Sequence, residues 1–169
     1  PTPDEPFSAG FDPDGQLPRL VVWAELKVID SGERFLFATT HVDNNSPSQV
    51  MSAPLIRERL GALAGDLPII LVGDFNSGLE HPAYIDLTTH AQAPFADTYD
   101  LASSPQATGD PELIEAYYWQ RRIDHIFIQP AERFEVTDWS IDLSSYANGT
   151  RTPSDHRPVH ATVQLRPAD

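Results

Sequence analysis

Two short apolar runs open the regular part of the chain. Residues 20–29 and 35–40 are rich in β-branched and aromatic side chains, which favour strands. Between them, residues 30–33 read Asp-Ser-Gly-Glu, a sequence typical of a hairpin turn. The pattern therefore predicts two antiparallel strands.

The apolar spacing changes at Ser46. From there apolar side chains recur every three to five residues, which is the period of an amphipathic helix, and Gly65 can end that helix. Pro54 predicts a kink in the helix or a delayed start. The apolar positions are Val50, Leu55, Ile56, Leu60 and Leu63.

The rest of the chain alternates strand and helix patterns. Residues 69–72 form a continuous apolar run, short enough for a buried strand, that stops at Gly73-Asp74. Residues 81–89 predict a short helix with a proline in its first turn, whereas residues 103–112 predict a loop. Three more strands are predicted over residues 122–129, 134–141 and 158–165.

This order of elements predicts mixed sheets with helices packed outside them, a layered α/β sandwich. Residues 1–16, which are rich in Pro, Gly and Asp, predict a loop or linker. A chain of 169 residues, 40% of them hydrophobic, builds one core and hardly two. We therefore expect residues 17–169 to be one domain or part of one.

The chain is strongly acidic. It carries 25 Asp and Glu against 11 Lys and Arg, a formal net charge of −14. This charge repels a polyanion at long range, so it disfavours nucleic acid and favours a small substrate. The same acidity also serves to keep a surface soluble.

The composition also bears on location. No apolar run is long enough to span a bilayer, so we expect a soluble protein without a transmembrane segment. A chain without Cys fits either a reducing or an oxidising compartment. The sequence therefore leaves a cytoplasmic and a secreted location open.

Polar clusters interrupt the ends of the predicted strands. In an α/β scaffold the loops at strand ends carry function, so these clusters are the candidates for chemistry. They span residues 40–44, 73–76, 122–125 and 154–158.

Asp74 and Asn76 stand two residues apart, so in extended chain their side chains share one face. The carboxylate can orient or deprotonate a water, and the amide can steady negative charge that develops on phosphorus oxygens. Taken alone, such a pair is more often a turn in which both residues bond their own backbone.

His156 and Asp124 form a second candidate pair. If their strands are neighbours, Asp124 can bond one imidazole nitrogen of His156, raise its pKa and leave the other nitrogen facing a phosphate. Asp155 is then free to hold a metal, and carboxylate oxygens without thiolates suit Mg²⁺ or Mn²⁺ better than zinc. The alternatives are a hydrogen-bonded structural His and an Asp that closes a turn.

Further polar and aromatic residues lie beside these clusters. His41 ends the second predicted strand, so its ring can donate to a substrate phosphate, and a surface His at a turn is equally consistent. Arg121 and Arg122 can clamp a phosphate or pair with acids, and we favour an ion pair for Arg121. Residues 117–119, Tyr-Tyr-Trp, are more typical of a core or interface than of a stacking surface.

Taken in order, the four clusters resemble the endonuclease/exonuclease/phosphatase family, whose members share the deoxyribonuclease I-like fold. The most specific stretches are Gly-Asp-Phe-Asn at 73–76 and Ser-Asp-His-Arg-Pro-Val at 154–159, supported by Arg-Ile-Asp-His-Ile-Phe at 122–127. The resemblance extends from about Leu17 to Leu165. It implies a four-layer αββα sandwich and a phosphoesterase that depends on Mg²⁺ or Mn²⁺.

The resemblance also implies a role for each matched residue. His156 is then the catalytic histidine at the scissile phosphate, and Asp124 the acid that orients it. Asp74 activates or positions the nucleophile, and Asn76 assists at the phosphate. The remaining matches are two contacts to the substrate phosphate and one metal ligand: His41, Asn44 and Asp155.

One part of the family pattern is absent from the sequence. The family domain begins with segments that carry a metal-site Asn and a metal-binding Glu, and no such segments precede Leu17. We therefore expect this chain to be the C-terminal part of a domain that lacks its N-terminal half, and to be inactive alone.

For the parent protein we expect hydrolysis of a phosphomonoester or phosphodiester, with a small or lipid-derived substrate favoured. Two alternatives stay open. One is a nuclease that acts on DNA or RNA, and the other is a non-catalytic interaction domain of the same fold.

Overall fold

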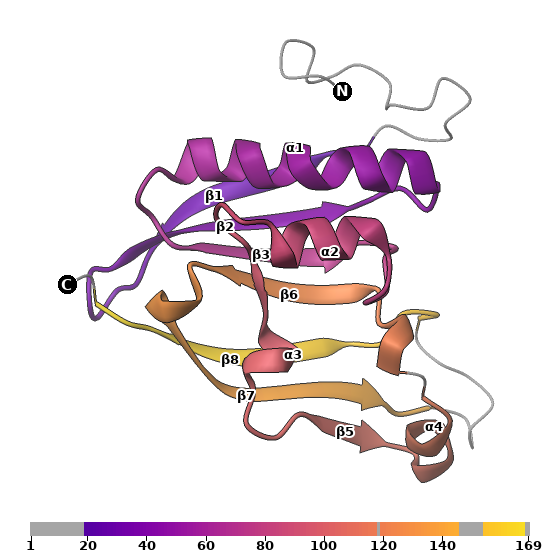
Figure 1. The fold of residues 1–169 in the computed structure, drawn as a ribbon. Helices are drawn as coiled ribbons and strands as arrows, with labels where there is room; N and C mark the ends of the chain where they lie inside the picture. Colours follow the sequence, from indigo (N-terminus) through magenta and orange to yellow (C-terminus); the bar gives the residue numbers. More distant parts are fainter. Residues whose placement is uncertain (1–18, 118, 146–153, 168–169) are drawn as a thin grey trace.

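The structure is a computed structural model that describes residues 19–117, 119–145 and 154–167. Helices α1 and α2 cover one face of a five-stranded sheet, and β6 of that sheet contacts β8 of a smaller, three-stranded sheet (Figure 1). Mixed sheets with helices outside them confirm the predicted α/β sandwich. The loop or linker predicted over residues 1–16 lies outside the described residues.

The larger sheet has the strand order β1-β2-β3-β6-β4. β1 and β2 form the predicted antiparallel hairpin, β3 is parallel to β2, and β6 is antiparallel to β3. The strand bounds are Val21–Lys27 for β1, Arg34–His41 for β2, Ile69–Asp74 for β3, Ala96–Asp97 for β4 and Asp124–Gln129 for β6.

The smaller sheet has the strand order β5-β7-β8. β7 and β8 pair antiparallel, as two of the strands predicted from the sequence, and β5 is parallel to β7. The strand bounds are Gln106–Gly109 for β5, Phe134–Leu143 for β7 and Val159–Leu165 for β8.

Helix α1 runs from Ser46 to Ala64. Its proline in the first turn occupies a position that needs no intrahelical N–H partner, and the helix ends before Gly65, as predicted. Because the helix continues through Pro54, the alternative of a delayed start is wrong.

The other helices are shorter. The predicted helix α2 covers Pro82–Thr89, and the His81 imidazole Nδ1 caps it by accepting a hydrogen bond from Ala83 N at 3.2 Å. The sequence pattern did not predict α3, α4 or the two 3₁₀ helices. Their bounds are Thr98–Leu101 for α3, Pro111–Ala116 for α4, and Trp119–Arg121 and Ala131–Arg133 for the 3₁₀ helices η1 and η2.

The main core lies between the larger sheet and helices α1 and α2. Leu71 and Phe127 from the sheet are fully buried, as are Leu60 of α1 and Leu87 of α2. Each such side chain stabilises the fold by about 1.5–3 kcal/mol on burial. The two helices and the central strands therefore share one packed core under the polar strand ends.

A second apolar cluster forms around Trp139, Ile141 and Leu143 of β7. Tyr117 and Trp119 pack against it with their rings 5.0 Å apart in an edge-to-face arrangement. Both residues therefore belong to a core, as predicted, and Tyr118 lies outside the described residues.

Gly73 allows β2 and β3 to approach closely. Its φ is +145°, and a Cβ atom there would lie 1.9 Å from the Thr40 carbonyl oxygen. Only glycine fits such a position, so the glycine of the Gly-Asp-Phe-Asn stretch serves the backbone geometry that precedes Asp74.

The prediction of a loop over residues 103–112 is wrong for residues 106–109 and 111–112. Residues 106–109 form β5, which pairs in parallel with β7 from Gln106 opposite Ser140 onward, and α4 begins at Pro111. A four-residue strand whose partner lies more than thirty residues away leaves no local periodicity to recognise, because its pairing depends on tertiary context.

Among the described helices, none has both the length and the apolar character that crossing a membrane requires.

Candidate active site

Three candidate residues stand at neighbouring strand ends. His41 is the last residue of β2 and lies opposite Asp74, the last residue of β3, in the parallel pairing. Asp74 in turn lies opposite Asp124, the first residue of β6, in the antiparallel pairing. The register of the sheet therefore places the three side chains in one row.

His156 joins this row from the segment that precedes β8. Its Nδ1 donates to the Asp124 carboxylate, at 2.9 Å from Oδ2 and 3.1 Å from Oδ1. Its Nε2 lies 3.6 Å from Asp74 Oδ2, and His41 Nε2 lies 3.2 Å from the same oxygen. The Asp74 carboxylate is thus placed between two imidazole rings.

The carboxylates change the proton affinity of His156. Its hydrogen bond to Asp124 raises the pKa of His156, partial burial opposes this, and the charges of Asp124, Asp74 and Asp155 add to the rise. Burial also raises the pKa of Asp124, against the effect of its bond to His156. An imidazolium is therefore favoured at a position with one nitrogen left to face a substrate.

The turn after β3 is held by its own polar groups. Asn76 adopts a φ of +49°, a region that Asn tolerates better than most residues, and its backbone N–H donates to Asp74 Oδ1 at 2.7 Å. The Asn76 side chain donates to the Val42 carbonyl at 2.9 Å, and Gln49 of α1 donates to the Asn76 carbonyl at 2.5 Å. The turn predicted as the alternative is present in part, since Asp74 bonds the local backbone whereas the Asn76 side chain bonds Val42, and Asp74 Oδ2 still faces the two histidines.

Two predicted residues lie beside this group. Asn44 is exposed in the loop between β2 and α1. Asp155 is exposed next to His156, and its Oδ1 accepts a bond from Ser154 Oγ at 3.4 Å. Within the described residues, the structure gives neither of them a hydrogen bond or ion pair to the group formed by Asp74, Asp124 and His156.

Arg122 does not contribute to this site. It is 2% exposed, donates to Asp97 Oδ2 at 3.3 Å and lies over the Tyr99 ring at 3.7 Å from its centroid. It is therefore a buried structural cation. Sequence reasoning missed Asp97 because nothing in its local sequence distinguishes it from the other acids.

One set of side chains could hold a cation. Asp74, Asp124 and His156 each offer a ligand atom, and these atoms lie within 4.8 Å of one another. Carboxylate oxygens with an imidazole nitrogen can bind a divalent metal, and the Asp124 carboxylate and His156 Nδ1 also share a hydrogen bond.

Comparison with known proteins gives a family match and several similar structures. Residues 6–156 match the model of the endonuclease/exonuclease/phosphatase family, and no curated protein sequence matches the chain. Mannosyl-6-phosphatase of Bacteroides thetaiotaomicron VPI-5482 is similar in structure, with 31% identity and a TM-score of 0.74 over 90% of this chain and 59% of that one. This chain therefore spans less than two thirds of the length of that relative.

More distant structures share the fold. The human nocturnin catalytic domain with bound sulfate is 19% identical, with a TM-score of 0.66 over 89% of this chain and 54% of that one. Danio rerio TDP2 with a single-stranded DNA product is 20% identical, with a TM-score of 0.67 over 93% of this chain and 66% of that one. With a family model that matches most of its length, and with the deoxyribonuclease I-like fold, the chain belongs to the endonuclease/exonuclease/phosphatase family.

Proposed function

We propose that the full-length protein is a metal-dependent phosphoesterase that hydrolyses a small or lipid-derived phosphoester. The observation that carries the proposal is the convergence of His41 and His156 on the carboxylate of Asp74, with Asp124 behind His156. Imidazoles beside a carboxylate, at the polar end of a sheet, suit attack by water on phosphorus.

Each side chain has a role in this proposal. Asp74 orients the attacking water and takes its proton as the new oxygen–phosphorus bond forms and the bond to the leaving oxygen breaks. His156, held as an imidazolium by Asp124, stabilises the negative charge that develops on the phosphoryl oxygens. His41, Asn44 and Asn76 are the proposed contacts to the substrate phosphate.

The residues present fit a hard divalent cation. The donors are carboxylates and one imidazole, without thiolates, which suits Mg²⁺ or Mn²⁺. Asp155 is a further proposed ligand because the family resemblance matches it to a metal-site position, and the same resemblance implies an additional Asn and Glu from an N-terminal segment. When bound, the cation would supply positive charge at the leaving oxygen.

Two observations support a small substrate. The formal net charge of −14 opposes the approach of a polyanion, and the 31% identical relative acts, by its name, on a mannosyl 6-phosphate. The relatives at 19–20% identity support the fold alone, because fold does not choose the substrate.

A substrate panel tests the proposal. The purified full-length protein would be incubated with a sugar phosphate, bis(p-nitrophenyl) phosphate and single-stranded DNA, each with Mg²⁺, with Mn²⁺ and with EDTA. We expect turnover of a small ester that EDTA abolishes and added Mg²⁺ or Mn²⁺ restores. Preferential cleavage of DNA would favour the nuclease, and no turnover of any substrate would favour the interaction domain.

A further inference from the structure

His125 is a buried imidazole directly beside Asp124. Because side chains alternate along a strand, it points to the opposite face of β6, and its side chain is 0% exposed. Aromatic rings enclose it, with centroids at 5.9 Å for Phe75, 5.0 Å for Tyr84 and 5.1 Å for Phe127.

Both ring nitrogens of His125 meet acceptors. Nδ1 lies 3.0 Å from Asp97 Oδ2, and Nε2 lies 3.0 Å from the backbone carbonyl oxygen of Ser77. A carbonyl oxygen and a carboxylate can only accept, so satisfying both bonds requires both nitrogens to donate.

Asp97 is held as a carboxylate by the groups around it. Burial works to raise the pKa of Asp97, but the hydrogen bond and charge of His125, together with Arg122 and the backbone N–H of Tyr99, outweigh burial and lower it. Tyr84 also donates to Asp97 Oδ2, at 3.2 Å. His125 is therefore anchored firmly on its Asp97 side.

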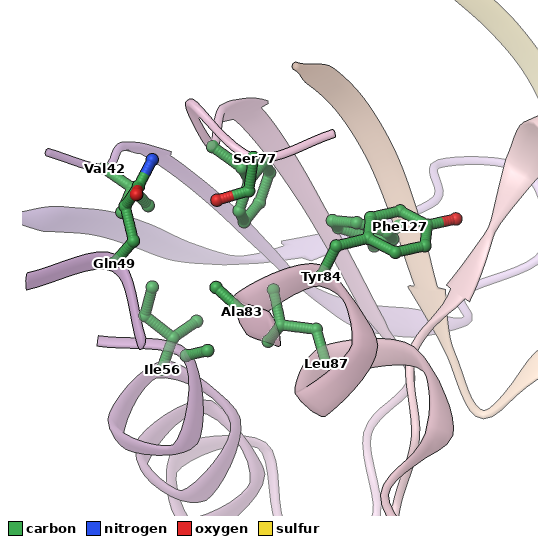
Figure 2. A pocket seen from close by; sticks show the side chains of 10 residues that line it. Val42, Gln49, Ile56, Ser77, Ala83, Tyr84, Leu87 and Phe127 are labelled. Carbon is green, nitrogen blue, oxygen red and sulfur yellow. The ribbon is translucent and has the colours of Figure 1, made fainter. Parts of the chain in front are cut away.

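Its other bond reaches the turn that carries the catalytic candidates. Ser77 follows Asn76 directly, is 1% exposed and has a buried hydroxyl without a hydrogen-bond partner among the described residues. Figure 2 shows Ser77 over a small pocket whose labelled side chains, except Gln49, are mostly apolar. The hydrogen bond from His125 therefore fixes the Ser77 end of the turn.

We propose that His125 is a positioning residue: by donating to the Ser77 carbonyl from a ring anchored on Asp97, it fixes the turn of Asp74 and Asn76 relative to Asp124. This inference rests on the proposed function of that site. It predicts an effect on catalysis through geometry, because displacement by about 1 Å can lower the rate by about 100-fold.

Two amide substitutions separate the two bonds. In His125→Asn the amide nitrogen replaces Nδ1 and keeps a donor toward Asp97, but it does not reach Ser77. In His125→Gln the amide nitrogen replaces Nε2 and can still donate to the Ser77 carbonyl. A matched control is His160→Asn on β8, where the histidine is exposed and pairs with Asp138 at 3.4 Å.

The experiment measures kcat and KM of these variants in the full-length protein, with thermal melting as the measure of folding. We expect His125→Asn to lower kcat about 10- to 100-fold with little change in KM, His125→Gln to recover most of kcat, and His160→Asn to match the wild type. Wild-type kcat in folded His125→Asn, or an equal loss in the Asn and Gln variants, would overturn the inference.

An NMR measurement tests the inference even if a variant fails to fold or the protein hydrolyses none of the substrates. In the wild type, NMR should detect an N–H proton on each ring nitrogen of His125, and in folded His125→Asn the amide signals of Asn76 and Ser77 should shift. Absence of the Nε2 proton would overturn the inference whatever the activity. Absence of wild-type turnover with that proton present would count against the proposed function only.

Discussion

At the scale of single residues, the proposed site depends on an imidazole that lies between two carboxylates. His156 lies 2.9 Å from Asp124 and 3.6 Å from Asp74. The folded protein thereby raises the pKa of His156 above its ordinary value of 6.5. A group with a raised pKa contributes stability below its unfolded pKa and loses that contribution as pH rises through the folded pKa.

The substitution Asp124→Asn should lower the pKa of His156, because an amide does not stabilise the imidazolium as a carboxylate does. NMR titration of the ring in the presence of a chelator measures this change. The free energy of unfolding of the variant should also show less gain toward acid pH. The exposed His160 ring is an internal control, and an unchanged pKa of His156 would show that the two residues are not partnered.

The sequence predicted Asp124 and His156 as partners and Asp74 as a separate candidate, because each belongs to a recognisable stretch at a strand end. The register of β3 and β6 places Asp74 opposite Asp124, and the segment before β8 brings His156 to Asp124. The sequence did not predict the role proposed for His125, since the Ser77 acceptor is a backbone carbonyl that no residue type records. A signal was present, however: alternation along β6 places an ionisable ring on the same face as Phe127.

At the scale of elements, the site depends on close approach of β2 and β3. Gly73→Ala should destabilise the fold by roughly 2–4 kcal/mol, because the new Cβ atom meets the Thr40 carbonyl and φ is unfavourable. Gly61→Ala is the matched control, since a Cβ there meets nothing within 4 Å and Ala favours the helix by up to about 1 kcal/mol. Denaturant unfolding measures the free energy of unfolding of both variants. Equal values would contradict the close approach of β2 and β3 at Gly73.

Elements with a local pattern were predicted and those without one were not. The apolar run of β3 and the spacing of α1 are properties of contiguous residues, so the sequence displays them. β4 has two residues and pairs with β6 from Ala96 opposite Ile128. Such pairing is decided by tertiary contacts, which local propensity does not encode.

At the scale of the whole molecule, β1 and β8 are edge strands of their sheets. β1 carries large exposed apolar side chains, with Trp23 at 47% and Val22 at 57% exposure. Exposed apolar edges invite pairing with further strands. This chain covers 59% of the mannosyl-6-phosphatase, so we infer that the complete active site needs segments beyond these residues.

We predict that the chain of 169 residues, assayed alone, shows no appreciable phosphoesterase turnover and binds Mg²⁺ weakly. Catalysis of this type needs a cation held by several oxygen ligands. Asp155 is exposed and lies outside the set of Asp74, Asp124 and His156, so these residues offer few ligands at one point. Hydrolysis assays and titration calorimetry would be repeated with the upstream segment added in trans. Robust metal-dependent turnover by the chain alone would contradict the prediction.

The assignment of the catalytic site is tested by kcat of the full-length protein after removal of a single side chain. His156→Ala and Asp74→Ala should each lower kcat by about 100-fold or more without a large change in melting temperature, because both act on the transition state. The control His160→Ala removes an exposed imidazole and should leave kcat unchanged. Near-wild-type kcat in His156→Ala or Asp74→Ala would contradict the assignment of this cluster as the catalytic site.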